Sequence, residues 1–420
     1  MRALGLVLLL ALLCWVPVSA GAEGLPPRAS IKPSVVTVTP GASQQFKVVL
    51  ATTRLRAASS PKKVTWSVND VVGGSAEFGR IDASGHYTAP DKAPAPREIR
   101  VRAEVEDAAN RYVWATAVVG TGEPSYRMVG HWSEPIVKPG RLRKPHGIGL
   151  DGQRNLLITD QTANRVFRYT REGKFLGEIG LGPGNEPGQF TEPRYATVDP
   201  SGNIYIVDVK SDRERLQVFD PDGHLIRIFA EKGTGPGQIL RGHGLAFDTQ
   251  QRLFVTDVDN MRVSAFEPSG KFLFAWGKDG LNPGEFNAPH GLYIDPNDDI
   301  FVNGYYGPTQ KFTADGRFVT AFAFGDPPDG PVYFHSLTGD RWGNIYVTVR
   351  TKAGYGGALE SQQGKKLSIL KFNNNGDYIC SLSLSVKEHT ESWAAVDDRG
   401  VIFALFTAKD SAGVEIYQEQ

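Results

Sequence analysis

Cysteine is scarce in this chain: its 420 residues include only two, Cys14 and Cys380. Cys14 lies inside an apolar N-terminal run, so a mature chain without that run keeps one cysteine and has no internal disulfide. This excludes the small exported domains that depend on disulfides for stability. Cys380 stands in the apolar stretch that begins at Tyr378, and we interpret it as a small core residue.

Excess charge and long apolar runs are also missing. Lysine plus arginine equals aspartate plus glutamate, 46 each, which gives no electrostatic reason to expect a nucleic acid or an anionic membrane as partner. The apolar run Leu4–Val16 has about thirteen residues, whereas a membrane span needs roughly twenty. A basic start and the small residues that end at Ala20 predict a signal peptide over residues 1–20. We therefore expect export to the periplasm, the cell surface or the medium, without a membrane span.

Helical periodicity is nearly absent after this segment, while 47 glycines and 27 prolines supply many turns. This composition favours an all-β protein. The length exceeds one ordinary core and suggests two domains. Residues 29–119 contain short alternating stretches such as Val35–Thr39 and Val64–Val68, which predict a β-sandwich with Trp66 in its core.

Residues 126–420 consist of a repeat. Six units each close a first strand with an aspartate, at intervals of 45 to 57 residues: Asp151, Asp199, Asp248, Asp295, Asp340 and Asp397. Four short strands per unit are typical of a propeller blade, so we predict a six-bladed β-propeller. The last unit ends after three strands, and Tyr126–Trp132 has the pattern of a fourth strand that would close the ring and remove its free edges.

The residue five positions before each aspartate is expected to line the central channel. These residues are His146, Arg194, His243, His290, His335 and Ser392. Four of the eight histidines of the chain occupy this one position. His146, His243 and His335 come from alternate blades and predict a site for zinc or another divalent ion with an open, catalytic coordination position. The alternative is that each imidazole donates to a carbonyl of a neighbouring blade. For His290 we consider a substrate contact, a partner of a metal ligand, or channel filling.

Two strings carry family resemblances. Trp66–Asn69 and Gly79–Pro90 resemble the bacterial Ig-like domains of exported proteins, which implies a spacer or adhesion module. The repeat itself resembles the NHL family of propellers over residues 126–420.

A more specific resemblance rests on the contexts of the alternate histidines. Pro145-His146-Gly-Ile, Gly242-His243-Gly-Leu and Phe334-His335-Ser-Leu resemble the zinc motifs of peptidyl-α-hydroxyglycine α-amidating lyase. That family cleaves an α-hydroxyglycine to a peptide amide and glyoxylate. The resemblance implies that Tyr305, after Asn303-Gly304, handles a substrate proton, and that Arg350 holds a carboxylate. Arg194 would add positive charge for the substrate.

Other functions remain open at this point. A non-enzymatic NHL propeller could bind a peptide or glycan on an Ig-like stalk, an alternative that rests on fold analogy. A structural envelope protein is a further possibility. A sugar-lactonase propeller would show acidic and asparagine ligands at the axis, where this chain has histidines.

Overall fold

The computed structural model describes residues 27–51, 61, 63–137, 140–210, 213–304, 308–322, 332–351, 368–385 and 391–420. Of residues 332–335, 350, 351 and 391 it describes only the backbone. Every regular element in these ranges is a β-strand, as the sequence predicts. No helix long and apolar enough to cross a membrane occurs in the described ranges.

Residues 28–119 form an N-terminal domain of three sheets. One sheet pairs β1 (Arg28–Lys32) with β4 (Lys47–Ala51). The second has the order β2 (Val35–Val38), β11 (Tyr112–Val119), β10 (Glu98–Val105), β5 (Val64–Val68) and β6 (Val71–Val72). The third has the order β3 (Ser43–Gln45), β9 (His86–Thr88), β8 (Gly79–Ile81) and β7 (Gly74–Ser75). Phe46, Tyr87 and the predicted Trp66 are buried in one apolar core.

The rest of the described chain forms six four-stranded sheets, which we number 1 to 6 in chain order. Sheet 1 is β13 (Pro145–Leu150), β14 (Leu156–Asp160), β15 (Arg165–Tyr169) and β16 (Phe175–Ile179). Sheet 2 is β17 (Pro193–Val198), β18 (Ile204–Lys210), β19 (Arg213–Phe219) and β20 (Leu225–Phe229). Sheet 3 is β21 (Gly242–Phe247), β22 (Leu253–Asp257), β23 (Arg262–Phe266) and β24 (Phe272–Trp276).

Sheet 4 is β25 (Pro289–Ile294), β26 (Ile300–Gly304), β27 (Thr309–Phe312) and β28 (Phe318–Phe322). Sheet 5 is β29 (Val332–Gly339), β30 (Ile345–Thr351), β31 (Ser368–Phe372) and β32 (Tyr378–Ser383). Sheet 6 is β33 (Glu391–Val396), β34 (Ile402–Thr407), β35 (Ser411–Glu419) and the much earlier β12 (Tyr126–Pro135).

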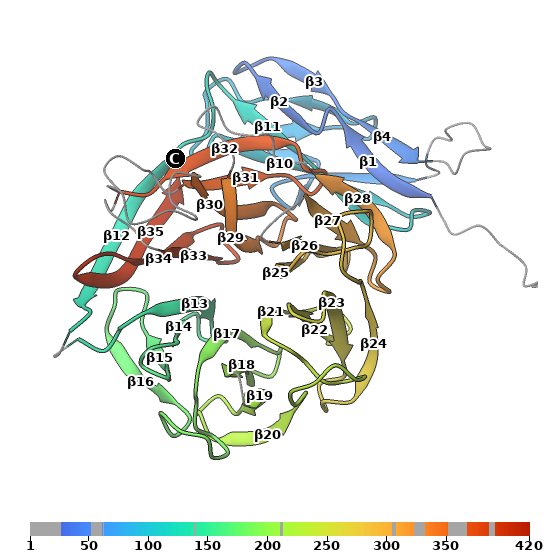
Figure 1. Cartoon of the computed structure of the whole chain (residues 1–420). Coiled ribbons are helices and arrows are strands. Elements are labelled where there is room, and N and C mark those ends of the chain that lie inside the picture. The colour runs from blue at the N-terminus through green and yellow to red at the C-terminus, as the bar shows by residue number, and fades with distance from the viewer. Residues whose placement is uncertain are drawn as a thin grey trace, which may run out of the picture.

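The six sheets stand around a central axis as in a β-propeller (Figure 1). Each first strand contacts the first strand of the next sheet, and β33 contacts β13, so the inner strands make a closed ring. β12 joins the sheet of the C-terminal strands, with Tyr126 opposite Glu419 and Pro135 opposite Ser411. β12, which precedes the repeat in the chain, therefore supplies the outer strand of the last sheet, as its sequence pattern predicts.

The repeated aspartates are turn residues. Asp151 accepts the backbone N–H of Asn155 at 2.8 Å, four residues later. The same i to i+4 bond recurs at the other five positions: Asp199, Asp248, Asp295, Asp340 and Asp397. These carboxylates accept hydrogen bonds from backbone N–H groups in the turn between first and second strands, which explains why the repeat has an aspartate there.

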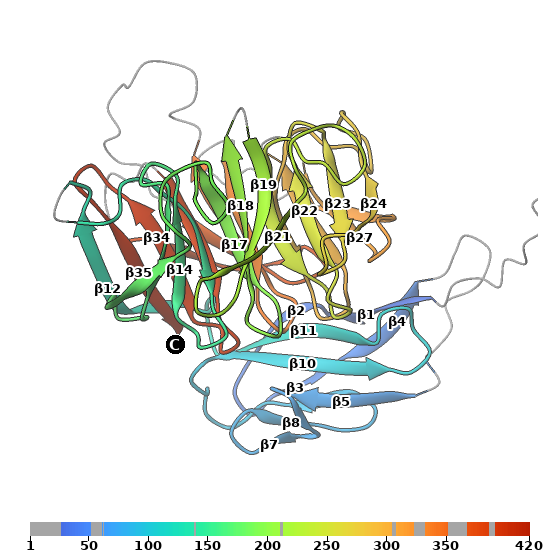
Figure 2. The same ribbon diagram turned by 90° about the horizontal axis from the view of Figure 1, so that it is seen from below.

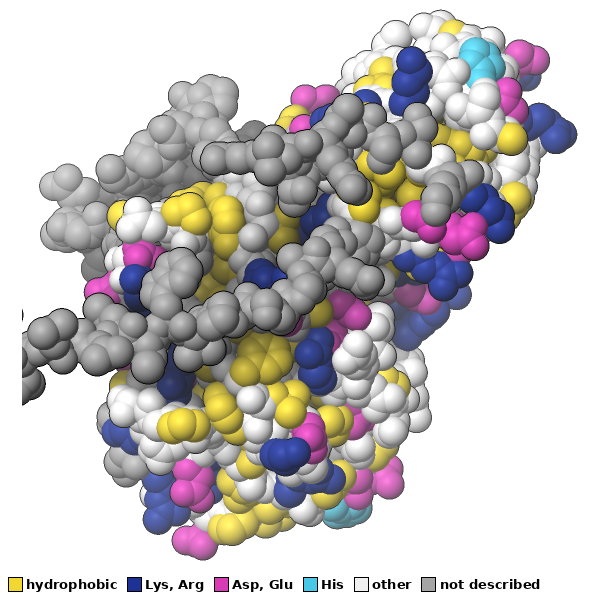
Figure 3. All heavy atoms as spheres, turned by 90° about the vertical axis from the view of Figure 1, so that its right-hand side faces the viewer, with side chains coloured by type: hydrophobic (Ala, Val, Ile, Leu, Met, Phe, Trp, Pro, Cys, Tyr) yellow, Lys and Arg dark blue, Asp and Glu magenta, His cyan; other side chains and the backbone are white. Residues whose placement is uncertain are grey.

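The N-terminal domain lies against one face of the ring (Figure 2). Some of its contacts are with turns between first and second strands: Tyr112 exchanges two hydrogen bonds with Asn297, and Asp70 accepts from Trp342 Nε1 at 3.1 Å. The axial histidines lie at the opposite ends of the first strands. On the side of the molecule seen in Figure 3, charged side chains of both signs are intermingled, consistent with the balanced composition.

Candidate functional site

The axial residues of sheets 1 to 5 all lie at irregularities of the first strand. Pairing with the second strand shifts register between Pro145 and Gly147, and the same shift occurs around Arg194, His243, His290 and His335. A β-bulge of this kind interrupts the ladder and re-aims the side chain of the extra residue. The local backbone thus repeats at five points around the ring.

Side-chain hydrogen bonds fix the backbone beside these bulges. Thr256 Oγ1 accepts the N–H of Gly244 at 2.7 Å and donates to the carbonyl of His290, in the next sheet, at 2.9 Å. A Cβ on Gly244 would lie 2.8 Å from that carbonyl oxygen. At Gly147 the corresponding approach, to the carbonyl of Arg194, is 2.4 Å. Neighbouring first strands therefore approach closely at both positions, which explains why glycine follows the histidine.

Three of the axial histidines form one cluster. The ring centres of His146 and His243 are 5.0 Å apart, and those of His243 and His290 are 3.4 Å apart. Trp393, from sheet 6, packs over all three, at 4.4 Å from His146, 5.4 Å from His243 and 5.6 Å from His290. Tyr195 lies 5.5 Å from His243. The histidines are therefore held in an aromatic environment.

His243 is the most deeply placed member. Its side chain is fully buried, and neither ring nitrogen has a hydrogen-bond partner among the described residues. Burial lowers the pKa of His243 well below its ordinary value, and charge on His290 and His146 lowers it further. The ring is consequently neutral near neutral pH. A neutral imidazole offers the lone pair that a divalent metal requires. Without such a partner, the two buried nitrogens lower the stability of the folded chain, because buried polar groups without hydrogen bonds cost free energy.

The distances between the histidine rings differ in whether they allow a shared metal ion. Zinc lies about 2.0–2.1 Å from each imidazole nitrogen, so two rings sharing a tetrahedral ion have centres about 5 Å apart. The His146–His243 pair, at 5.0 Å, fits this arrangement, and the His243–His290 pair, whose rings are tilted at 33° with centres 3.4 Å apart, does not. His146 Nδ1 also faces the carbonyl oxygen of Arg194, in the next sheet, at 3.4 Å. The alternative without a metal predicts this contact, and the outer nitrogen of a metal-binding histidine makes a contact of the same kind.

The third predicted ligand, His335, is in β29, but its side chain lies outside the described part of the structure. Within the described part, no group of three or more histidine, cysteine, aspartate or glutamate side chains is arranged to hold a metal ion. The metal site therefore stays a prediction.

The other predicted residues are placed as follows. Tyr305 lies outside the described residues; the preceding Gly304 pairs with Pro289, beside His290. Arg350 pairs with Tyr333 through the backbone of β30, and its side chain is not described. Arg194 forms an ion pair with Glu192 at 2.6 Å, so its charge is compensated within the chain.

Trp393 and Tyr195 were not identified from the sequence, although the repeat contains a signal. The position after the axial residue is glycine in sheets 1, 3 and 4 and serine in sheet 5. It is Tyr195 in sheet 2 and Trp393 in sheet 6. A large aromatic side chain where the other copies carry almost none indicates packing that is specific to that place in the ring.

Comparison with known proteins supports the propeller assignment. No protein-family model matches the chain. The rat "Peptidylglycine alpha-amidating monooxygenase" is 29% identical over 126 residues, which are 28% of this chain and 13% of the rat protein. The mouse "NHL repeat-containing protein 3" is 30% identical over 128 residues, 28% of this chain and 37% of that protein. Together with the sheets, these matches support an NHL-type β-propeller.

Solved structures resemble this chain only distantly. Virginiamycin B lyase from Staphylococcus aureus has 12% sequence identity and a TM-score of 0.47, covering 70% of this chain and all of the lyase. A protein of unknown function from Bacteroides thetaiotaomicron has 13% identity and a TM-score of 0.47, covering 94% of this chain and 99% of that protein. Likeness at this level carries no information on chemistry.

Proposed function

We propose that this chain is an exported zinc-dependent lyase similar to peptidyl-α-hydroxyglycine α-amidating lyase, built on a six-bladed propeller that follows an Ig-like domain. Zinc, or another divalent ion, would be held at the axis by His146, His243 and His335. The observation that carries the proposal is His243, whose buried ring nitrogens have no partner in the described structure and whose distance from His146 suits a shared ion.

A zinc ion in this position would act as a Lewis acid toward a substrate oxygen. The chain's own residues would do the rest. Tyr305 would take the proton of the α-hydroxyl group as the carbon–nitrogen bond breaks, so that the hydroxyl carbon becomes the aldehyde of glyoxylate. Tyr305 would then relay this proton to the departing amide nitrogen, and Arg350 would hold the carboxylate through bidentate hydrogen bonds.

The aromatic residues around the cluster have a separate role. Trp393 and Tyr195 are at most 9% exposed and pack against the histidine rings. They would keep water away from the ring faces that they contact. Burial raises the pKa of Tyr195 to about 12, so its hydroxyl stays protonated and can donate a hydrogen bond but cannot act as a base. The base is therefore assigned to Tyr305. The N-terminal domain lies on the other face of the ring (Figure 2) and leaves the histidine end uncovered by that domain.

The direct test is metal analysis combined with an assay for glyoxylate. Purified wild-type chain should contain about one zinc per molecule and should release glyoxylate from an N-acylated α-hydroxyglycine. His243→Ala should lose both. His224→Ala is the matched control, because that histidine is 80% exposed on a turn beside Asp220 and should change neither.

The outcomes separate the candidate functions. Zinc without glyoxylate release would retain the metal site and reject the lyase. Wild-type protein without zinc, equal to His243→Ala, would reject the metal site as well and favour the non-enzymatic binding module.

A further inference from the structure

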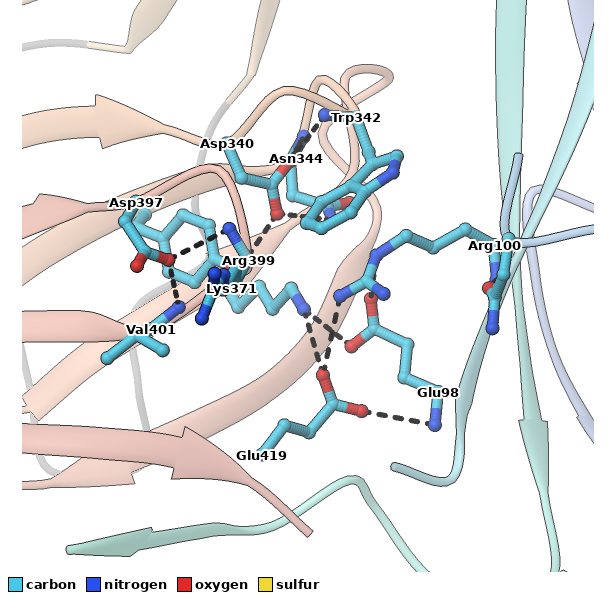
Figure 4. Close-up of polar contacts among 12 residues, drawn as sticks. Glu98, Arg100, Asp340, Trp342, Asn344, Lys371, Asp397, Arg399, Val401 and Glu419 are labelled. Carbon is cyan, nitrogen blue, oxygen red and sulfur yellow. Dashed lines mark hydrogen bonds and ion pairs between the residues drawn. The ribbon is translucent and has the colours of Figure 1, made fainter. Parts of the chain in front are cut away.

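The N-terminal domain and the ring share a buried cluster of four charged side chains (Figure 4). Lys371 Nζ lies 2.5 Å from Glu98 Oε2 and 3.8 Å from a carboxylate oxygen of Glu419. Arg100 lies 3.7 Å from Glu419 and 3.9 Å from Glu98. The Lys371 and Glu98 side chains are 2% and 0% exposed. Two basic and two acidic side chains thus meet away from solvent.

The four residues come from three parts of the fold. Glu98 and Arg100 belong to β10 of the N-terminal domain, Lys371 to β31 of sheet 5, and Glu419 to β35 of sheet 6. Backbone groups of β10 and the residue before it also bond to the ring: the N–H of Glu98 donates to Glu419 Oε1 at 3.1 Å, and the N–H of Arg97 donates to the carbonyl of Gln420 at 3.2 Å. The last two residues of the chain are therefore bound by the N-terminal domain.

This end of the chain is where the ring closes. Glu419 stands opposite Tyr126 in the pairing of β35 with β12. The interface also includes neighbouring sheets. The guanidinium of Arg100 lies 3.8 Å from the ring centre of Trp342 in sheet 5, and Tyr112 accepts a hydrogen bond from Asn297 in sheet 4. The domain consequently touches sheets 4, 5 and 6 on one face.

A buried charge is costly unless a partner of opposite charge is held in place beside it. Two ion pairs of the cluster join the N-terminal domain to the ring: Glu98 pairs with Lys371, and Arg100 pairs with Glu419. Separation of the two parts would leave these pairs broken. A domain that moves freely as a spacer is incompatible with this arrangement.

We propose that the N-terminal domain functions as a clamp on the closing sheet: it holds the C-terminal strand in the ring and fixes sheets 5 and 6 against each other. This function is independent of the chemistry at the axis, since the N-terminal domain contacts the ring on the side where the first strands end, whereas the axial histidines lie near the start of those strands.

Cleavage of the connecting segment tests the clamp in the full chain. A protease site inserted between Thr121 and Gly122 would be cut in the native state, and the products would be run on gel filtration at physiological salt. We expect the N-terminal domain to stay bound to the ring after the cut. Release of the domain would overturn the proposal, because docking would then depend on the covalent link.

Hydrogen exchange tests the ion cluster itself. Glu98→Gln leaves Lys371 without its closest anion, and exchange in β35 and β12 should become at least about tenfold faster. Glu106→Gln is the control, because Glu106 forms a 3.6 Å pair with Lys63 in which both side chains are more than 60% exposed. Equal exchange in the two variants would overturn the proposal.

A second variant covers the case in which Glu98→Gln does not fold. The double variant E98M/K371M removes both charges of the closest pair, and such replacements of buried pairs are often neutral. We expect it to fold and to restore slow exchange in β35. A double variant that exchanges as fast as Glu98→Gln would contradict the assignment of the clamp to this pair.

Discussion

Replacement of His243 by phenylalanine tests the reason for burying this residue. The variant keeps a flat ring at the axis and removes both ring nitrogens, which have no partner among the described residues. A buried polar group without a hydrogen bond costs about 1–3 kcal/mol, and a neutral imidazole has two such groups. The larger ring costs about 1–3 kcal/mol in repacking. We therefore expect the metal-free variant to be more stable than metal-free wild type, by about 1–3 kcal/mol.

Zinc should reverse this order. A ligand that binds only the folded chain stabilises it by about 2.7 kcal/mol at a hundred times its dissociation constant. Wild type should gain this amount and His243→Phe should gain none. The assay is urea unfolding of both proteins, once with a chelator and once with zinc, with His224→Phe as the exposed control.

Two results would refute the reasoning. A metal-free variant that is less stable than wild type would mean that the imidazole makes stabilising contacts of its own. Zinc that leaves the unfolding midpoint of wild type unchanged would mean that the unbonded nitrogens of His243 do not serve a metal.

Three further predictions concern other parts of the fold. Trp393→Ala should weaken zinc binding about 10–100-fold, because the indole fixes the planes of the histidine rings, whereas Trp393→Phe should keep most of the affinity in a competition titration. Gly147→Ala should lower the free energy of unfolding by about 1–3 kcal/mol, since its Cβ would lie 2.4 Å from a carbonyl oxygen; Gly152→Ala, with nothing nearer than 4.0 Å, is the matched control in the same urea assay. Burial, and then the charge of Glu98, raise the pKa of Glu419 from 4.5 to about 7. The folded chain therefore retains a proton that the unfolded chain releases, and stability should fall as pH rises from about 4.5 to 7; Glu419→Gln should remove this slope, and an unchanged slope would reject the assignment.

Much of the fold could be predicted because its signals are local. The turn bond of Asp151 to Asn155 joins residues four apart, and the alternation of Val64–Val68 is a property of five consecutive residues. Repetition of such local patterns identified the sheets and their order. The position of β12 could also be predicted. The last unit of the repeat lacks a fourth strand, and the segment before the first unit has the pattern of one, so pairing the two closes the ring and removes its free edges.

The candidate site could be predicted only in part. The repeat places His146 and His243 at one structural position, since equivalent residues of a symmetric ring face the same axis. Symmetry does not say how side chains of different size share the limited space there. The close approach of the His290 and His243 rings and the packing of Trp393 over them depend on contacts across the axis, between residues from different sheets.

The sequence by itself determined the all-β class, the repeat and the shared position of His146, His243 and His290 near the axis, because each follows from short-range pattern and from the closure of the ring. Only the tertiary structure decided which nitrogens are left without partners, which aromatic rings enclose them, and that the N-terminal domain grips the closing strand through Glu98. Those features arise from contacts between residues of different sheets or domains, whose distances depend on the packing of the whole chain and not on any local pattern.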